Sequence, residues 1–260
     1  MTPELRFGFS PCPNDTFAFH ALVHGLVPAP FRVRPELADI EELNRSAHAA
    51  TYELTKLSFG ALASLGDRYT LLRSGAALGH GVGPLVVARR PATLASLAGA
   101  RVAIPGRETT AYLLLQLAAP AVEAIELRYS EILGAVERGE VDAGLIIHES
   151  RFTYADHGLV RVADLGEWWE AESGLPVPLG AICARSDLSP ELIAAAEVAI
   201  RASVEHAFAH PDASSEYVRA HSQELSPEVC RQHIDLYVNE FTIDLGDTGM
   251  RAVDALLARA

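Results

Sequence analysis

The sequence predicts an α/β fold of two lobes with a ligand cleft between them, and three observations support this. Short apolar runs are each followed by a polar loop and an amphipathic helical segment, a pattern that recurs at least four times. The series restarts after residues 89–91, and the chain is expected to cross back near residues 176–179. The 260 residues are 49% hydrophobic and 21% charged, which is enough apolar sequence for a large core. Clefts between such lobes are preferred small-molecule sites.

The repeated units share the order of strand, loop and helix. Their predicted strands, in chain order, are residues 5–9, 52–54, 101–104 and 141–147. Their predicted helices are residues 16–24, 58–65, 109–117 and, before the fourth strand, 129–138. Ligands of open α/β sheets bind beyond the carboxyl ends of the strands, so the loops that follow these strands are the first candidates for a site.

The predicted larger lobe is discontinuous and comprises residues 1–90 and 181–260. The smaller lobe is inserted between these two parts as residues 91–180. Apolar residues recur at helical spacing from Pro190 onward, which predicts a helical C-terminal tail on the larger lobe.

The charge balance argues against several classes of partner. With 21 basic and 34 acidic residues the net charge is −13, so we expect neither a nucleic acid nor a membrane partner. No uncharged apolar run approaches the roughly 18 residues that span a bilayer, and the N-terminal segment lacks the features of a signal peptide, so a cytoplasmic location is expected.

The three cysteines are too few and too far apart for a disulfide framework. The oligomeric state is not predicted.

His148 is the strongest candidate for catalysis among the ten histidines. It follows an apolar run directly, so its ring is expected to point into the cleft from the end of a strand. Imidazole has an ordinary pKa near 6.5 and acts as a base at neutral pH without a large shift. A purely structural histidine is the alternative. Cys12, in the loop after the first strand, could form a nucleophilic pair with His148, although no acyl-transfer motif accompanies it.

Lys56 is the single lysine of the chain, whereas every other basic residue is arginine. An ammonium group is a compact charge that a guanidinium does not replace in a tight pocket, so one interpretation is that this position requires an ammonium. The alternative is that one lysine has survived by chance. Helix starts near Asp15, Ser58 and Thr109 offer unpaired N–H groups to an anion, although ordinary helix capping also explains these residue types.

No metal or nucleotide cofactor is expected. His20 and His24 have the spacing of a zinc-binding helix, but Ala21 stands where such a helix carries its glutamate. The glycines of residues 75–83 precede a strand rather than a helix, so they do not form a dinucleotide-binding loop. Trp169 and its aromatic neighbours near the second crossing are expected to pack between elements.

Several segments together closely resemble the 1,4-dihydroxy-6-naphthoate synthase family of the futalosine route to menaquinone. The match runs in order over nearly the whole chain. It is carried by Ser-Pro-Cys-Pro-Asn-Asp-Thr-Phe at 10–17, Thr-Lys-Leu-Ser-Phe at 55–59, Gly-Val-Gly-Pro-Leu at 81–85, Pro-Gly-Arg-Glu-Thr-Thr-Ala at 105–111, Asp-Ala-Gly-Leu-Ile-Ile-His-Glu-Ser-Arg-Phe-Thr-Tyr at 142–154, Asp-Leu-Gly-Glu-Trp-Trp at 164–169, Pro-Leu-Gly at 178–180 and His-Ile-Asp-Leu-Tyr-Val-Asn at 233–239.

The resemblance implies a fold similar to type II periplasmic binding proteins. It also implies a lyase that converts cyclic de-hypoxanthine futalosine, a small aromatic carboxylate, to 1,4-dihydroxy-6-naphthoate and dihydroxyacetone without a cofactor. His148 corresponds to the family's proton acceptor. The substrate-binding residues that carry over are Lys56, Leu57, Ser58, Thr109 and Thr110. Residues that we expect to line the cleft are Cys12, Asn14 and Asp15.

Two alternatives remain at this stage. A chorismate-dehydratase-like enzyme would have a similar fold in the same pathway, but the segments around Lys56 and His148 resemble the synthase instead. A small-anion-binding protein that does no chemistry would need the same two-lobed cleft, because a fold does not determine a function.

Overall fold

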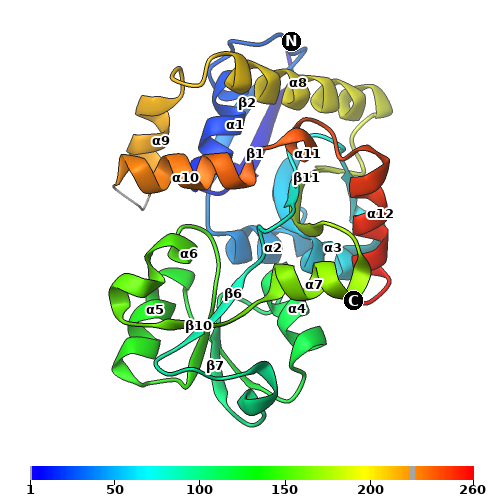
Figure 1. The fold of residues 1–260 in the computed structure, drawn as a ribbon. Helices are drawn as coiled ribbons and strands as arrows, with labels where there is room; N and C mark the ends of the chain where they lie inside the picture. The colour runs from blue at the N-terminus through cyan, green and yellow to red at the C-terminus, as the bar shows by residue number, and fades with distance from the viewer. Residues whose placement is uncertain (1, 223–225) are drawn as a thin grey trace.

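A computed structural model gives the fold of residues 2–222 and 226–260, whose strands form two sheets (Figure 1). Each sheet is the centre of one lobe, and helices cover both. Residues 1 and 223–225, which the predicted larger lobe includes, lie outside the described residues.

The sheet of the larger lobe has the strand order β2-β1-β3-β11-β4, and β5 pairs with β11 as well. The long strand β11 is antiparallel to β3, β4 and β5, whereas β1 is parallel to β2 and β3. The strands of this sheet are β1 (Glu4–Phe9), β2 (Arg32–Leu37), β3 (Leu54–Ser58), β4 (Tyr69–Leu71), β5 (Ala77–Gly79) and β11 (Val177–Arg185). Because β11 comes from the distant end of the inserted lobe, the larger lobe is assembled from two parts of the chain.

The sheet of the smaller lobe has the order β10-β6-β9-β7-β8. In it, β7 is parallel to β8 and β9, whereas β6 is antiparallel to β9 and β10. The strands are β6 (Leu85–Ala88), β7 (Arg101–Ile104), β8 (Glu123–Glu126), β9 (Ala143–Ile146) and β10 (Val160–Asp164).

The helices pack on the faces of both sheets and between the lobes (Figure 1). In Figure 1, α8, α9 and α10 lie with α1 on the larger lobe, α5 and α6 lie on the smaller lobe, and α2, α3 and α7 lie where the lobes meet. The helices are α1 (Pro13–Val23), α2 (Ile40–His48), α3 (Phe59–Leu65), α4 (Thr110–Ala118), α5 (Tyr129–Arg138), α6 (Ser150–Thr153), α7 (Leu165–Ser173), α8 (Pro190–Ala209), α9 (Ser215–His221), α10 (Pro227–Tyr237), α11 (Glu240–Ile243) and α12 (Gly246–Leu257).

Most of the predicted elements are confirmed, because they carry strong periodicity and clear ends. Helix α5 has the predicted bounds and ends at Gly139, whose φ of 75° is the left-handed conformation that glycine adopts without strain. Helix α4 begins one residue after its prediction, with Thr109 as the N-cap that accepts a hydrogen bond from the Tyr112 N–H. The helical tail after Pro190 is also present, as α8 to α12.

The prediction that Lys56 lies in a loop is wrong. It lies within β3, whose five residues are all buried between β1 and β11. The polar residues of this segment predict a loop, but their polar atoms have partners inside the protein. Ser58 exchanges hydrogen bonds with the Asn44 side chain, for example, and the Thr55 hydroxyl donates to a backbone carbonyl.

The chain crosses between the sheets at residues 80–84 and again at 174–176. The predicted boundary at residue 90 is therefore several residues late as a sheet boundary, because β6 pairs with β9 and β10 of the smaller lobe. The boundary at 180/181 likewise lies inside β11, which starts at Val177. Whether the lobes are separate folding domains stays a prediction.

The largest apolar cluster is shared by the two lobes. It joins Leu78 and Ala181 of the larger sheet to Val86 and Leu114 of the smaller lobe, and it includes the fully buried Trp169 of α7. Trp169 thus packs between elements, as predicted, and its Nε1–H donates to the Pro176 carbonyl. The lobes therefore meet through a continuous core on one side of the cavity described next.

Candidate functional site

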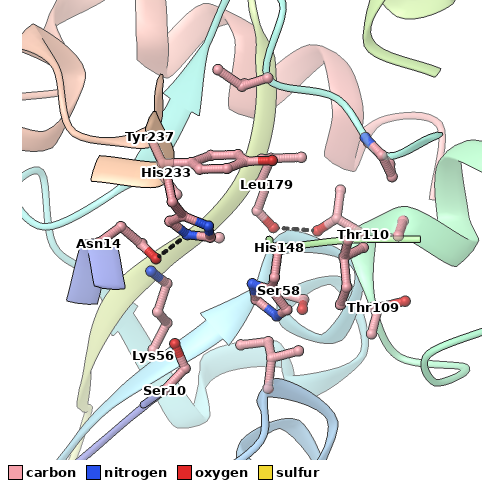
Figure 2. Close-up of a pocket in the computed structure, with 17 residues that line it drawn as sticks. Ser10, Asn14, Lys56, Ser58, Thr109, Thr110, His148, Leu179, His233 and Tyr237 are labelled. Carbon is pink, nitrogen blue, oxygen red and sulfur yellow. Dashed lines mark hydrogen bonds between the residues drawn. The ribbon is translucent and has the colours of Figure 1, made fainter. Parts of the chain in front are cut away.

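A cavity of about 640 Å³ lies where the two lobes face each other, within the usual size range of small-molecule sites (Figure 2). Both sheets and the helical tail contribute to it. Its lining residues are Ser10, Asn14, Ile40, Lys56, Ser58, Ala77, Val82, Pro84, Thr109, Thr110, Ala111, Ile147, His148, Leu179, Gly180, His233 and Tyr237. The cavity therefore brings together six of the predicted site residues from segments that are far apart in the sequence.

Asp15 organises the polar end of this cavity from just behind its wall. Its carboxylate accepts hydrogen bonds from the Ser10 N–H (3.2 Å) and hydroxyl (2.6 Å) and from the Asn14 amide (2.8 Å). The Lys56 ammonium forms a salt bridge with the same carboxylate. Because α1 starts at Pro13, the helix places Asn14 and Asp15 in its first turn, where a carboxylate is stabilised by the helix dipole.

Lys56 is only 7% exposed, so its charge would be costly without a partner. Asp15 supplies that partner, and the net charge of the pair is zero. The single lysine is thus a buried ion-pair residue at the cavity wall, and the ammonium group alone does not make the cavity cationic.

Leu57 does not line the cavity. Side chains alternate along a strand, so Lys56 and Ser58 face the cavity whereas Leu57 faces the opposite side of the sheet. There Leu57 packs in a buried cluster with Leu65 and Tyr69. The pleat of β3 directs the Leu57 side chain into the core, so the substrate contact of Leu57, which stays a prediction, would have to come from its backbone.

His148 follows β9, and its φ of 57° places it in the left-handed region, which residues other than glycine rarely adopt. Strain of this kind gathers at functional sites. The ring reaches α1, where Nδ1 lies 3.4 Å from the Cys12 Sγ, and it makes an edge-on contact with the Tyr129 ring at 5.0 Å between centroids. The chain turn at His148 thus directs its ring into the cavity, as the sequence predicts.

Burial lowers the pKa of His148 to about 4, and Lys56 adds to this effect, whereas Asp15 opposes it. The pKa of His148 is thus below the ordinary imidazole value, because the ring lies in a site that disfavours its charged form. At neutral pH the imidazole carries one proton. When that proton is on Nδ1 and is donated to Cys12, Nε2 is a free acceptor.

Cys12 lies behind the cavity wall and is 3% exposed. Burial is the main cause that raises the pKa of its thiol well above the ordinary value, and the negative charge of Glu149 adds to it. A thiolate is the reactive form of cysteine, so this environment disfavours the nucleophilic pair of Cys12 and His148. The geometry instead makes Cys12 a neighbour that orients the His148 ring.

Thr110 and Ser58 also line the cavity. The Thr110 hydroxyl donates to the Leu179 carbonyl at 2.5 Å, a contact between α4 and β11 that Figure 2 shows as a dashed line. Thr109 caps α4. The first N–H groups of α4, on Thr110 and Ala111, have no acceptor within the helix and lie at the cavity. The start of α4 thus lies where the sequence predicts a helix N-terminus that favours an anion, and the binding of an anion there stays a prediction.

His233 is a cavity residue that the sequence analysis missed. It lies on α10, where helical spacing places it on the buried face, and it is 1% exposed. Its Nε2 lies 2.9 Å from the Asn14 Oδ1, and its ring is stacked near that of His148, with 6.3 Å between centroids (Figure 2). Residues 233–239 are among the segments that carry the family resemblance, but only the position of α10 in the fold brings these two rings together.

The pair His20 and His24, which has the spacing of a zinc-binding helix, lies outside this site. His20 and His24 lie side by side on α1 next to Tyr217 of α9. Among residues 2–222 and 226–260, no three histidine, cysteine, aspartate or glutamate side chains are grouped as metal ligands. In the same part of the chain, no helix has the length and apolar character needed to cross a membrane.

Comparison with known proteins decides the family. A family model described as "Menaquinone biosynthesis" matches residues 5–260. The chain belongs to this menaquinone-biosynthesis family. It is 59% identical to a 1,4-dihydroxy-6-naphthoate synthase of Thermus thermophilus over 256 residues, which cover 98% of this chain and 93% of the relative. It is 47% identical to the synthase of that name from Streptomyces coelicolor, over 98% of this chain and 92% of the relative.

Solved structures confirm the predicted fold of this family member. A protein from Archaeoglobus fulgidus has a TM-score of 0.94 and 40% identity, covering 99% of this chain and 96% of its own. The alkanesulfonate-binding protein of Xanthomonas axonopodis has a TM-score of 0.68 at 16% identity, over 90% of this chain and 84% of its own. The second likeness concerns the fold alone, which is that of periplasmic binding proteins.

Proposed function

We propose that this protein is a carbon-carbon lyase that converts cyclic de-hypoxanthine futalosine to 1,4-dihydroxy-6-naphthoate and dihydroxyacetone, with His148 as proton acceptor and no cofactor. The observation that carries the proposal is 59% identity to a named 1,4-dihydroxy-6-naphthoate synthase over 98% of the chain. The neutral ring of His148 in the cavity supports the role of a base.

The substrate would lie with its carboxylate toward the start of α4, where the N–H groups of Thr110 and Ala111 point and Ser58 is close. Apolar side chains of the cavity, Val82, Ile147 and Leu179, suit the flat ring system. The polyol part would then face the polar end with His148. This orientation needs no cationic cavity, which fits the neutral pair of Lys56 and Asp15.

His148 Nε2 takes the proton of a hydroxyl group on the polyol, which is fused to the ring system through a spiro carbon, and the polyol ring opens by cleavage of its C–O bond, so that its oxygen stays on the spiro carbon. A proton shift within the three-carbon unit then places a carbonyl next to the C–C bond that joins it to the spiro carbon. In a retro-aldol step the oxygen on the spiro carbon forms a carbonyl, the C–C electron pair leaves with the three-carbon unit, and protonation of that unit gives dihydroxyacetone. The remaining diketone enolises to the aromatic diol. The proton held by His148 is returned to the products, so the substrate atoms equal those of the two products. No oxidant, reductant or water enters.

Mixing the purified protein with cyclic de-hypoxanthine futalosine, without added metal or nucleotide, tests the proposal. Products are followed by chromatography with mass detection, and binding is followed by titration. Formation of dihydroxynaphthoate with an equal amount of dihydroxyacetone is the expected result. Tight binding without turnover would favour a binding protein, and neither binding nor turnover by folded protein would overturn the proposed substrate.

A further inference from the structure

His233 has one ring nitrogen in use and one without a partner. Nε2 lies 2.9 Å from the Asn14 Oδ1, whereas Nδ1 is buried and has no hydrogen-bond partner among the described residues. Figure 2 shows the ring between Asn14 and the interior of the cavity. A buried polar atom without a partner costs free energy, so such an atom in a cavity wall requires an explanation.

The Asn14 amide fixes which nitrogen of His233 carries the proton. Its Nδ2 donates to the Asp15 carboxylate at 2.8 Å, which leaves Oδ1 to face His233. An amide oxygen only accepts hydrogen bonds, so His233 must donate from Nε2. Asp15 is itself held by Ser10 and Lys56, so the amide has no reason to turn.

A neutral His233 protonated at Nε2 has a bare lone pair on Nδ1. Burial lowers the pKa of His233 well below its ordinary value, and the neighbouring His148 and Lys56 add to that effect, so the neutral form is the one present at pH 7. The Tyr237 ring packs against the imidazole with 4.6 Å between centroids, which limits rotation of the ring. His233 Nδ1 is thus a fixed hydrogen-bond acceptor, and no donor among the described residues is within hydrogen-bond distance of it.

We propose that His233 Nδ1 is a subsite for a hydroxyl group of the ligand, which donates a hydrogen bond to it beside His148. This proposal rests on the proposed function for the identity of the ligand, whose polyol part would supply the hydroxyl. His148 and His233 then divide two tasks, because His148 removes a proton whereas His233 positions the polyol.

Two variants of His233 distinguish the roles of its two ring nitrogens. In His233→Gln, the amide reaches the place of Nε2 and retains a partner for Asn14 but loses the acceptor at Nδ1. In His233→Asn, the shorter amide offers an oxygen at the place of Nδ1. We expect KM for cyclic de-hypoxanthine futalosine to rise about tenfold in His233→Gln, the loss of one good hydrogen bond, and less than about threefold in His233→Asn. Direct titration with 1,4-dihydroxy-6-naphthoate, which has no polyol, should give the same affinity for all three proteins.

Equal KM values for the wild type and His233→Gln, or equal losses in both variants, would overturn the proposal. A measurement on the wild type keeps it testable if the variants do not fold. In the ¹⁵N spectrum of the histidine-labelled protein, Nδ1 of His233 should be unprotonated, and dihydroxyacetone should shift it. A protonated Nδ1, or no shift at saturating dihydroxyacetone, would overturn the subsite. A shift in a protein without turnover would retain the subsite and reject the proposed reaction.

Discussion

At the scale of single residues, His148 combines backbone strain with a depressed pKa. The left-handed φ of 57° costs on the order of 1–3 kcal/mol for a residue with a side chain, and the fold retains it. The strained turn is what brings the ring from the end of β9 to the α1 loop and Cys12. We infer that the place of the ring in the cavity, rather than an unusual charge on it, makes His148 suitable as a base.

Replacing His148 by asparagine is expected to lower kcat by about 10²–10⁴-fold because the proton acceptor is lost. Affinity for 1,4-dihydroxy-6-naphthoate should stay within a few-fold, since the amide occupies part of the same space. Steady-state kinetics and product titration measure the two quantities. His210→Asn, an exposed histidine outside the cavity, is the matched control. A kcat near that of the wild type would remove His148 from the role.

The pH dependence of activity should follow the low pKa of His148. Because burial lowers that pKa from 6.5 to about 4, the ring remains neutral and able to accept a proton well below pH 6. We expect the acid limb of kcat/KM nearer pH 4 than pH 6.5. The unfolded chain takes up protons on this histidine first, so stability should fall as pH decreases from 6.5 toward 4. Initial rates from pH 4 to 8, corrected for loss of folded protein, test this, and a limb at 6.5 would contradict it.

The substitution Lys56→Arg is expected to weaken substrate binding about tenfold while leaving a folded protein. A guanidinium is wider than an ammonium and cannot occupy the same buried position beside Asp15, so it would displace Asp15 or extend into the cavity. Titration with the substrate measures the effect. Arg251→Lys, an exposed swap of the same two residue types, is the control. Unchanged affinity in Lys56→Arg would mean that the single lysine is a compositional accident.

At the scale of elements, the sequence predicts helices and strands with one buried face better than it predicts elements that are buried on both faces. Helix α5 alternates apolar and polar residues at helical spacing and ends in glycine, and its predicted bounds agree with the structure. Strand β3 is buried along its whole length, and its polar side chains are satisfied by distant residues such as Asp15 and Asn44. Local sequence does not contain those partners, so it predicts a loop for this segment.

The dependence on tertiary partners also explains which site residues the sequence predicts and which it does not. His148, Ser58, Thr109 and Thr110 follow strands or begin helices, positions from which a side chain reaches a cleft. His233 does neither, because it lies within α10 on the face that helical spacing assigns to the core. It lines the cavity because α10 packs against the start of α1, a tertiary contact between residues more than 200 positions apart.

Helix α2 and the loop before α4 form a contact between the lobes that depends on pH. Glu41 Oε2 accepts a hydrogen bond from the Glu108 N–H, and the side chain lies so close to Gly106 that no Cβ would fit there. Burial raises the pKa of Glu41 to about 7, while Arg45 opposes the rise. The native pKa is above the unfolded one, so ionisation removes stability as pH rises from 4.5 through 7.

Glu41→Gln is therefore expected to raise the melting temperature at pH 8, where the wild type carries a buried charge. The neutral amide keeps an oxygen for the Glu108 N–H. The increase should be on the order of 2–4 °C for each kcal/mol gained, and it should be smaller at pH 5, where Glu41 is protonated. Thermal melts of both proteins at the two pH values test this. A lower melting temperature of the variant at pH 8 would show that the ion pair with Arg45 outweighs the cost of burial.

At the scale of the whole molecule, the shared apolar cluster predicts that both lobes unfold together. The cluster contains side chains from both sheets and from α7 and α12, so each lobe completes its packing with side chains of the other, although each also has a smaller buried cluster of its own. Calorimetry should show one transition whose calorimetric and van't Hoff enthalpies agree. Two resolved transitions would mean that the lobes are independent folding domains, as the discontinuous division of the sequence would allow.

The shared core also bears on how this molecule could report that its cavity is occupied. A receptor that serves a transporter reports an occupied cleft by hinge closure, which the transporter recognises as a new shape. Lobes joined by a continuous core have little freedom to rotate, because packed interiors resist deformation. A partner that senses shape would find nearly the same surface on the free and the occupied molecule. We therefore expect that other molecules detect the use of the cavity only through the products that it releases, and not through a change in the shape of the protein.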